Sequence, residues 1–586
     1  MTTGLGIVGN CSFNALLDRG SVEWLCWPRP DSSFVFGPLL DRDRGGAFVV
    51  EGVEATEVTQ EYVENTNVLR TVFTGPTGSF ELLDFAPRFS LFDRFYKPLM
   101  LVRILRPLDG EPRAVVRCHP VYAYGETEAS CWRGSNHLQF TELPTPVRLT
   151  TNVPLSYIEE ERAFLIERDH HLVLTWGQPL ETGLEETAER FLERTVDYWR
   201  RWVKGTRTPR DYQHEVIRSA LVLKLHQYED TGSLLAATTT SLPEHPGSGR
   251  TWDYRYCWLR DAYFTPNAFE RLGHNEEMEK FLFFLRNLCE ERAGELQPAY
   301  TISGGEQAAE QELTWLAGYR GEQPVRVGNQ AFEHIQNDVY GEMILAVSRL
   351  FLDARFAGEV PPHTALDLVS SLLAQIEARI DEPDAGPWEL RGVTRLHSFS
   401  VLTHWAGAQR AVEVAEALGD DGLRTRALAV QRQAAHILET RCWNDDLGAL
   451  TQAAEGKHLD AVMLLAVQLG FFAPDDPRAD AHVNAIQKAL RVDGGLLRRY
   501  AAPDDFGTPE AAFAVCSFWL AEALALLGRQ EEGRELFEHL LTLHNGLGLY
   551  SEDLLPGSLE QSGNFPQTYS HVGLINAAFR LSRRWE

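Results

Sequence analysis

The chain has 586 residues, a formal net charge of −28 and 44% hydrophobic residues, which is enough apolar material for two or three packed domains. A negative surface repels nucleic-acid phosphates and anionic lipid headgroups, so we expect neither nucleic acid nor a membrane as a partner. The residues before Asn10 lack a basic segment and a long apolar segment, and no transmembrane stretch of about 18 apolar residues follows. We therefore expect a globular cytoplasmic protein.

Short motifs that bind metals or cofactors are missing or stand in the wrong context. The eight cysteines form no Cys-x-x-Cys or Cys/His cluster, which predicts reduced, mostly buried thiols. The segment 4–9 matches the dinucleotide-binding pattern GxGxxG, but β-type sequence follows it where a βαβ unit would need a helix. We expect no metal ion and no other cofactor.

The first part of the chain has the pattern of strands. From Gly4 to about Thr175, short β-type runs alternate with turn residues, as where Val68–Phe73 is followed by the turn sequence Gly-Pro-Thr-Gly at 75–78. This pattern predicts an antiparallel β-sandwich domain over residues 1–180.

After the strands, the apolar period becomes helical. An acidic helical stretch from Glu185 to Trp202 predicts a helical linker over 181–208, and the remainder, 209–586, contains about a dozen helical stretches. The clearest are 275–288, 335–353, 363–380, 397–419, 422–442, 458–470, 509–527, 530–544 and 570–583. Paired helices with long loops and no fixed short repeat favour an (α/α)6 barrel over a four-helix bundle or a solenoid. The fold class is multidomain, β plus α.

Residues 252–261, Trp-Asp-Tyr-Arg-Tyr-Cys-Trp-Leu-Arg-Asp, combine aromatic and ionic side chains. Sugar sites need both, because aromatic rings cover the apolar faces of a pyranose while Arg and Asp hydrogen-bond to its hydroxyls. The alternative is an ordinary helix start with an ion pair between Arg260 and Asp261. From composition alone the two interpretations are equally good.

Residues 386–392, Gly-Pro-Trp-Glu-Leu-Arg-Gly, place a carboxyl group beside an indole. Partial desolvation there favours the protonated form, which a general acid must hold near neutral pH. Glu389 is the candidate acid. In isolation, a surface glutamate that caps a turn explains the motif better.

A third cluster joins Glu552 and Asp553 to residues 563–571, Gly-Asn-Phe-Pro-Gln-Thr-Tyr-Ser-His. Paired carboxylates can polarise a water molecule, and Asn, Gln and Ser can orient it. A capped helix behind a solvated acidic loop is again the favoured alternative when this segment is considered alone.

Taken together and in this order, the clusters resemble glycoside hydrolase family 15, which contains glucoamylases, glucodextranases and bacterial trehalases. The likeness covers nearly the whole chain. It includes the motifs at 7–10, 24–31, 253–261, 318–321, 338–342, 388–389 and 563–567.

The resemblance implies a β-sandwich followed by an (α/α)6 barrel whose loops form a pocket for one terminal glucose. It places Glu389 at the family's general acid and Glu552 at its general base, in an inverting reaction. It implies substrate binding by Tyr254, Trp258, Arg260, Asp261, Trp388, Arg499 and Tyr569. Glu342 is a third carboxylate candidate, for which the resemblance suggests a structural role.

Two departures from the family pattern bear on the substrate. Gln323 stands where many bacterial members have an arginine, and Val401 stands where a lysine is common. Both changes are expected on the leaving-group side of the pocket.

We expect an exo-acting α-glucosidase of the glucoamylase type that releases β-glucose from short α-1,4- or α-1,6-linked oligosaccharides. Trehalase is the alternative within the family. A phosphorolytic or non-catalytic carbohydrate-binding α/α-barrel protein is the alternative of another class. The sequence leaves the oligomeric state open.

Overall fold

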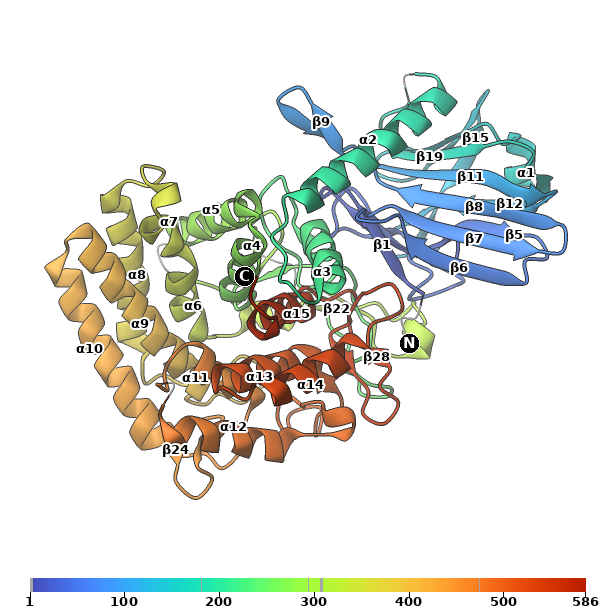
Figure 1. The fold of residues 1–586 in the computed structure, drawn as a ribbon. Coiled ribbons are helices and arrows are strands. Elements are labelled where there is room, and N and C mark those ends of the chain that lie inside the picture. Colours follow the sequence, from blue (N-terminus) through green and yellow to red (C-terminus); the bar gives the residue numbers. More distant parts are fainter. Residues whose placement is uncertain (1–3, 181, 293–294, 306–308, 474, 586) are drawn as a thin grey trace.

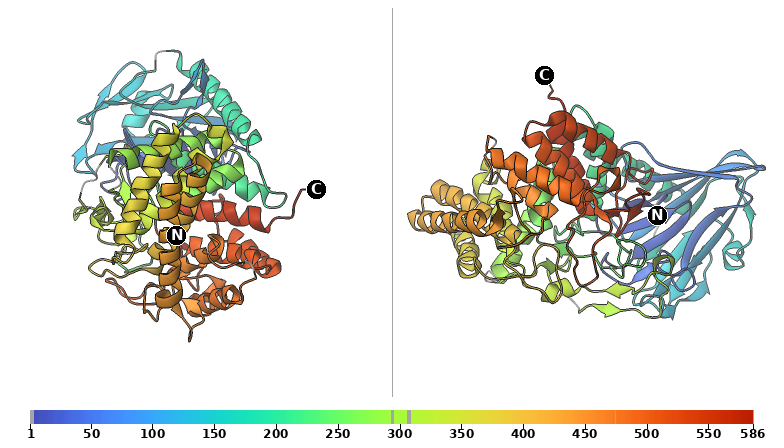
Figure 2. Two further views of the ribbon diagram at one scale, coloured as in Figure 1. Left: turned by 90° about the vertical axis from the view of Figure 1, so that its left-hand side faces the viewer. Right: turned by 90° about the horizontal axis from the view of Figure 1, so that it is seen from below.

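The computed structural model describes residues 4–180, 182–292, 295–305, 309–473 and 475–585. Two packed antiparallel sheets form its N-terminal part, and a ring of helices forms its C-terminal part (Figure 1). In the views of Figure 2 the sheets lie at one side of the ring. The predicted β-sandwich and (α/α)6 barrel are confirmed.

The sandwich consists of a seven-stranded and an eight-stranded sheet. The first contains β1 (Gly6–Gly9), β2 (Asn14–Asp18), β3 (Ser21–Cys26), β4 (Phe34–Phe36), β5 (Ala47–Gly52), β12 (Arg113–His119) and β18 (Phe164–Leu165). The second has the order β15 (Ser130–Arg133), β16 (His137–Thr141), β17 (Val147–Thr151), β19 (His170–Trp176), β11 (Met100–Gly110), β8 (Gly78–Phe85), β7 (Leu69–Gly75) and β6 (Glu57–Tyr62). Phe48 of the first sheet packs against Arg103 of the second in the space between the sheets. Trp24 instead reaches the helical part, where its indole N–H donates to Thr238 O at 3.0 Å.

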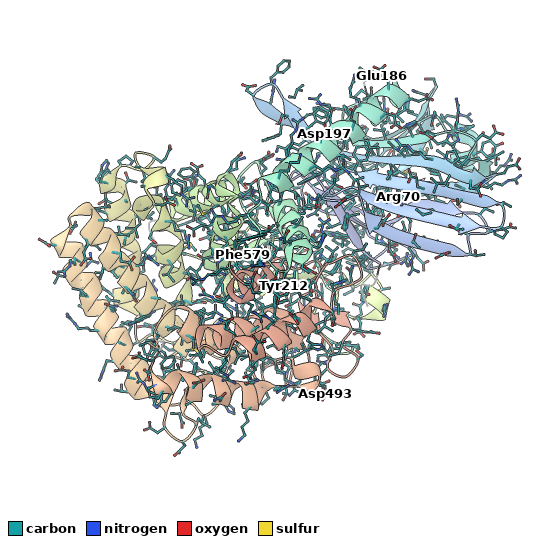
Figure 3. All side chains as sticks on the ribbon, viewed as in Figure 1. Arg70, Glu186, Asp197, Tyr212, Asp493 and Phe579 are labelled. Carbon is teal, nitrogen blue, oxygen red and sulfur yellow. The ribbon has the colours of Figure 1, made fainter. Side chains whose placement is uncertain are left out.

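The predicted linker helix is α2 (Leu184–Lys204), and it is packed against the sandwich. Phe191 and Leu192 bury their side chains with apolar residues of the eight-stranded sheet. Glu186 and Asp197 remain on the outer surface (Figure 3). The predicted boundary between 180 and 181 falls at the edge of the described residues, because residue 181 is not described.

The helical ring has an inner and an outer layer within the described residues. The inner segments are α4 (Asp261–Leu272), α6 (Asp338–Val347), α9 (Ser398–Leu418), the short pair η5 (Ala461–Leu464) and α11 (Leu465–Gln468), α13 (Ala514–Leu526) and α15 (Thr568–Leu581). Each contacts the next, and α15 contacts α4, which closes the ring. The outer layer contains α3 (Gln213–His226), α5 (Asn275–Glu291), α8 (Pro362–Arg379), α10 (Asp421–Ile437), α12 (Pro477–Leu490) and α14 (Gln530–Leu541).

Several predicted helix bounds are wrong, for identifiable reasons. The predicted helix 458–470 is instead η5 and the four-residue α11. The predicted helix 509–527 begins only at Ala514, because Ala512 and Phe513 form β26, which pairs with β27 (Asp553–Leu554). Helix α12 was missed, although Asp476 caps it and Pro477 occupies its first turn, the usual signals of a helix start.

No helix among the described residues is long and apolar enough to cross a membrane. All eight cysteines are free thiols; seven are buried and Cys131 is exposed.

A buried ion pair joins the sandwich to the helical ring. The Arg88 guanidinium, which is fully buried, donates to both carboxylate oxygens of Glu229 at 2.9 and 2.8 Å. Burial raises the pKa of Glu229, but Arg88, Lys224 and Lys280 outweigh burial and hold this pKa well below its usual range. Glu229 is therefore ionised, and its charge is balanced inside the interface.

We expect Glu229→Gln to destabilise the protein by about 3–5 kcal/mol, because the Arg88 charge would stay buried without its counterion. Scanning calorimetry should show a lower temperature for the first unfolding transition. Asp230→Asn is the matched control, since Asp230 is half exposed and its loss should cost less than about 1 kcal/mol. Equal effects of the two substitutions would contradict this role of Glu229.

Candidate active site

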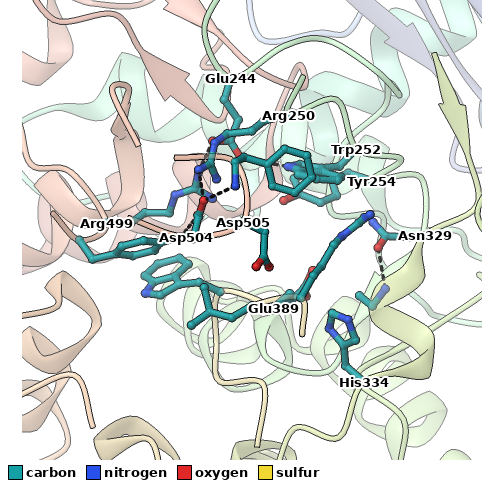
Figure 4. Close-up of a pocket in the computed structure, with 16 residues that line it drawn as sticks. Glu244, Arg250, Trp252, Tyr254, Asn329, His334, Glu389, Arg499, Asp504 and Asp505 are labelled. Atoms are coloured by element: carbon teal, nitrogen blue, oxygen red, sulfur yellow. Dashed lines mark hydrogen bonds and ion pairs between the residues drawn. The ribbon is translucent and has the colours of Figure 1, made fainter. Parts of the chain in front are cut away.

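The candidate site lies at the end of the barrel where the inner helices begin. The loops before α4, α6, α9 and α13 contribute side chains to it (Figure 4). The loop before α15 contributes Gln567. This position follows from the chain's architecture, because every inner helix starts at the same end and the connecting loops converge there.

Two adjoining cavities, of about 420 and 490 Å³, form the pocket. Tyr254, Trp388, Glu389 and Arg499 line both of them. The inner cavity is further lined by Trp258, Arg260, Asp261 and Tyr569, and the outer one by Glu244, Arg250, Trp252, Asn329, His334, Arg391, Asp504, Asp505 and Phe506.

The structure therefore brings eight of the nine predicted site residues to the walls of this pocket. The ninth, Glu552, is fully buried and is not among the described residues that line either cavity. Its electrostatic neighbours Tyr254 and Arg499 do line both cavities, so Glu552 lies in the layer directly behind the wall. The roles assigned to the nine residues remain predictions.

Glu389 ends a tight turn that hydrogen bonds to the Asp384 carboxylate hold in place. The Asp384 carboxylate accepts hydrogen bonds from the backbone N–H of Asn337 at 2.7 Å and of Gly386 at 3.1 Å, and from the Ser400 hydroxyl at 2.7 Å. Glu389 itself has a left-handed backbone with a φ of 61°. Such a conformation in a non-glycine residue costs free energy and persists only where the surroundings enforce it.

Two side chains of the 252–261 segment hold the Glu389 carboxylate. The Trp258 indole N–H donates to its Oε1 at 2.6 Å, and an Arg260 Nη lies 3.4 Å from the same oxygen. The neighbouring Trp388 is oriented separately, since its indole N–H donates to both oxygens of Asp460 at 2.9 Å. The Glu389 side chain thus has a defined position at the junction of the two cavities.

Glu552 is positioned by backbone pairing and by a close glycine. Its backbone N–H donates to Asn564 O at 3.0 Å, and the Asn564 N–H lies 3.4 Å from its Oε2. A Cβ at Gly563 would lie only 2.9 Å from Glu552 Oε2, and Gly563 also has a φ of 74°. Both observations explain why glycine stands at 563.

The electrostatic environment of Glu552 favours its protonated form. Burial and the adjacent Glu244 carboxylate raise the pKa of Glu552 to about 8, against the opposing influence of Arg499, the Asn564 N–H and the Tyr254 hydroxyl. Burial, Glu552 and Glu244 also raise the pKa of Asp553 well above its usual range. The ligand oxygens of these three acids lie within 4.8 Å of one another, a spacing that one cation could bridge. Arg499 already contacts Glu244 and supplies positive charge there.

Several buried donors in the pocket have no hydrogen-bond partner among the described residues. They include Nε and Nη1 of Arg260, Nε of Arg499 and the Tyr569 hydroxyl. Buried polar groups are normally satisfied, so a set of free donors around one cavity indicates a ligand rich in acceptor oxygens. Asp261 adds a carboxyl group whose pKa is raised to about 7 by burial, although Arg260 opposes the rise.

Gln323 and Val401, the two departures from the family pattern, lie outside the pocket lining. The Gln323 amide donates to Leu316 O, and Val401 is fully buried in α9. Neither is among the described residues that line the pocket, so the effect of lacking an arginine and a lysine at these positions stays a prediction. Glu342 is also buried, and desolvation together with Asp338 raises its pKa well above the usual range.

Sequence reasoning missed part of the pocket. Glu244, Arg250, Asn329 and His334 stand singly in loop segments without a distinctive pattern. The adjacent acids Asp504 and Asp505 were the one available signal, because paired carboxylates shortly after Arg499 resemble the pairs already considered.

We expect Glu552→Gln to raise the melting temperature by about 2–4 °C near pH 8. The folded-state pKa of Glu552 lies above its unfolded value, so ionising this carboxyl group costs stability as pH rises towards about 8. Below about pH 4.5 the group is protonated in both states, and the gain should vanish. Glu531→Gln, at a surface position, is the control with the same charge change. A gain independent of pH would argue against this origin.

Two protein-family models together match most of the chain. The model of glycosyl hydrolases family 15 matches residues 210–579, and that of the trehalase-like N-terminal domain matches residues 4–162. A trehalase of Mycolicibacterium smegmatis is 34% identical, with 99% of this chain and 91% of that protein covered. A trehalase of Thermoplasma volcanium is 30% identical, with 98% of this chain and 93% of that protein covered.

Among solved structures, a bacterial glucoamylase complexed with acarbose has a TM-score of 0.70 and covers 98% of this chain and 93% of its own. At 15% sequence identity this likeness concerns the fold alone. The family match covers the helical ring except the last two residues of α15, together with the loops that form the pocket. The chain belongs to glycoside hydrolase family 15.

Proposed function

We propose that this protein is a trehalase, which hydrolyses α,α-trehalose to two molecules of glucose. The observation that carries the proposal is the likeness to trehalases at 34% and 30% identity along almost the entire chain. These relatives favour the trehalase alternative over the glucoamylase-type activity expected from sequence. The two adjoining cavities suit a substrate of two sugar rings.

In this proposal the inner cavity holds the glucose whose anomeric carbon is attacked. The free donors of Arg260 and Tyr569 and the Asp261 carboxyl group hydrogen-bond to its hydroxyls, while Tyr254 and Trp258 form an aromatic wall. Glu389, at the junction of the cavities, protonates the glycosidic oxygen as the second glucose leaves into the outer cavity.

Glu552 acts as the general base. Its Oε1 accepts no hydrogen bond from the described residues and can accept one from the attacking water. The base is active in its ionised form, and Arg499 is the cation that favours this form. Attack from the face opposite to Glu389 inverts the configuration at the attacked carbon.

The first test measures glucose release from trehalose, maltose, isomaltose and maltotriose, with the anomers followed by NMR. Cleavage of trehalose by inversion yields one β-glucose from the attacked ring and one α-glucose from the leaving ring. We therefore expect equal initial amounts of both anomers from trehalose and little glucose from the other sugars. Glu389→Gln and Glu552→Gln should each lower kcat by at least about a thousandfold.

Other outcomes of this experiment are equally informative. Preferred cleavage of maltose or isomaltose would support the glucoamylase-type activity, and α-glucose alone from trehalose would contradict inversion. Release of glucose 1-phosphate that requires added phosphate would indicate a phosphorylase. Tight sugar binding without turnover would indicate a binding protein.

A second prediction concerns pH. Glu244→Gln removes the carboxylate that disfavours ionised Glu552, so the pKa of Glu552 should fall. Because ionised Glu552 is the active form, the acidic limb of the kcat/KM profile should move to lower pH by about one unit. Glu244→Asp is the matched control, since it keeps the charge and should leave the limb near its original position. A shift to higher pH in Glu244→Gln would contradict this account.

A further inference from the structure

Two neighbouring acids at the mouth of the pocket differ in their surroundings. Asp504 is used structurally: its carboxylate accepts from the backbone N–H of Phe506 at 2.8 Å, from the Tyr500 hydroxyl and from the Arg250 guanidinium. Asp504 and Gly507 also exchange backbone hydrogen bonds of 3.1 Å. The turn 504–507 is therefore held in one conformation against the barrel.

Asp505 sits within this fixed turn and has a different orientation. Its carboxylate points into the outer cavity, whereas Asp504 points to its partners at the cavity wall (Figure 4). Asp505 makes no hydrogen bond or ion pair with any residue that the structure describes. A fixed backbone thus presents a free carboxylate to the pocket.

The surfaces around Asp505 are those of a sugar site. The Phe506 ring packs edge-on against Trp252, with ring centroids 5.2 Å apart. Arg391 covers the Trp252 ring at 4.6 Å, and its guanidinium is held by two hydrogen bonds to Glu310 at 3.1 and 2.8 Å. Glu310 holds Arg391 and also pairs with Arg326 at 3.3 Å. Neither arginine forms an ion pair with Asp505, whose carboxylate has no cationic partner among the described residues and remains available to hydroxyl donors.

We infer that Asp505 determines specificity for the leaving sugar by accepting hydrogen bonds from its hydroxyls. The inference rests on the proposed function, since it concerns the second ring of a disaccharide. Asp505 lines the outer cavity but is not among the described residues of the inner one. The effect of Asp505 on catalysis should therefore depend on the leaving group of the substrate, and not on the glucose that is attacked.

The experiment compares trehalose with α-glucosyl fluoride, which has the same attacked glucose but no second ring. In Asp505→Ala and Asp505→Asn, KM for trehalose should rise about tenfold or more, the usual effect of losing a hydrogen bond to a charged group. The kcat/KM for the fluoride should stay within about twofold of wild type. Asp505→Glu, which keeps the charge, should retain part of the preference for trehalose.

A structural role for Asp505 would give a different pattern. Because its side chain has no partner among the described residues, Asp505→Ala should leave the melting temperature unchanged. A large fall, or equal losses on both substrates, would overturn the inference. Unchanged KM for trehalose would also overturn it. If wild type cleaves the fluoride but not trehalose, the proposed function fails, and the same comparison is made with the disaccharide that the enzyme does cleave.

Discussion

The pocket depends on one constraint, the closure of a ring in which every inner helix begins at the same end. Asp261, Asp338 and Thr568 each start an inner helix there. Helix N-termini carry partial positive charge and unpaired N–H groups, so this end of the barrel favours acidic side chains and oxygen-rich ligands. The gathering of carboxyl groups in a protein of net charge −28 therefore has a local physical basis in addition to its overall composition.

Arg260 and Arg499 supply positive charge to the carboxyl groups around the pocket, and each interacts with a different set of them. Arg260 interacts with Glu389, Asp261 and Asp338, and Arg499 with Glu244, Glu552 and Asp553. Arg250 adds a third cation, which lies near Glu244 and also acts on Asp553. Burial raises the pKa of Asp261, Asp338, Glu552 and Asp553 in spite of these cations. A bound sugar that donates hydroxyl hydrogens would stabilise their ionised forms.

The sequence could predict those parts of the site that stand close together in the chain. Trp388 and Glu389 are adjacent, as are Arg260 and Asp261, and their chemistry can be inferred from composition once the family order is seen. Glu244 could not be predicted, because its effect on Glu552 arises from a contact between segments at opposite ends of the barrel sequence. The fold class followed from the change in apolar period, whereas the start of α13 depended on strand pairing that no local pattern reveals.

Ring closure has a consequence for synthesis. Residues up to α9 already include Arg260 and Glu389, but Glu552 and the helix α15 that contacts α3 and α4 come much later in the chain. A ribosome-bound chain therefore contains Glu389 before Glu552, and the surfaces of α3 and α4 that α15 covers are not yet buried. Until α15 docks, these surfaces are open to chaperones or to other chains. The pocket is consequently complete only when the last helix, which carries Tyr569, is in place.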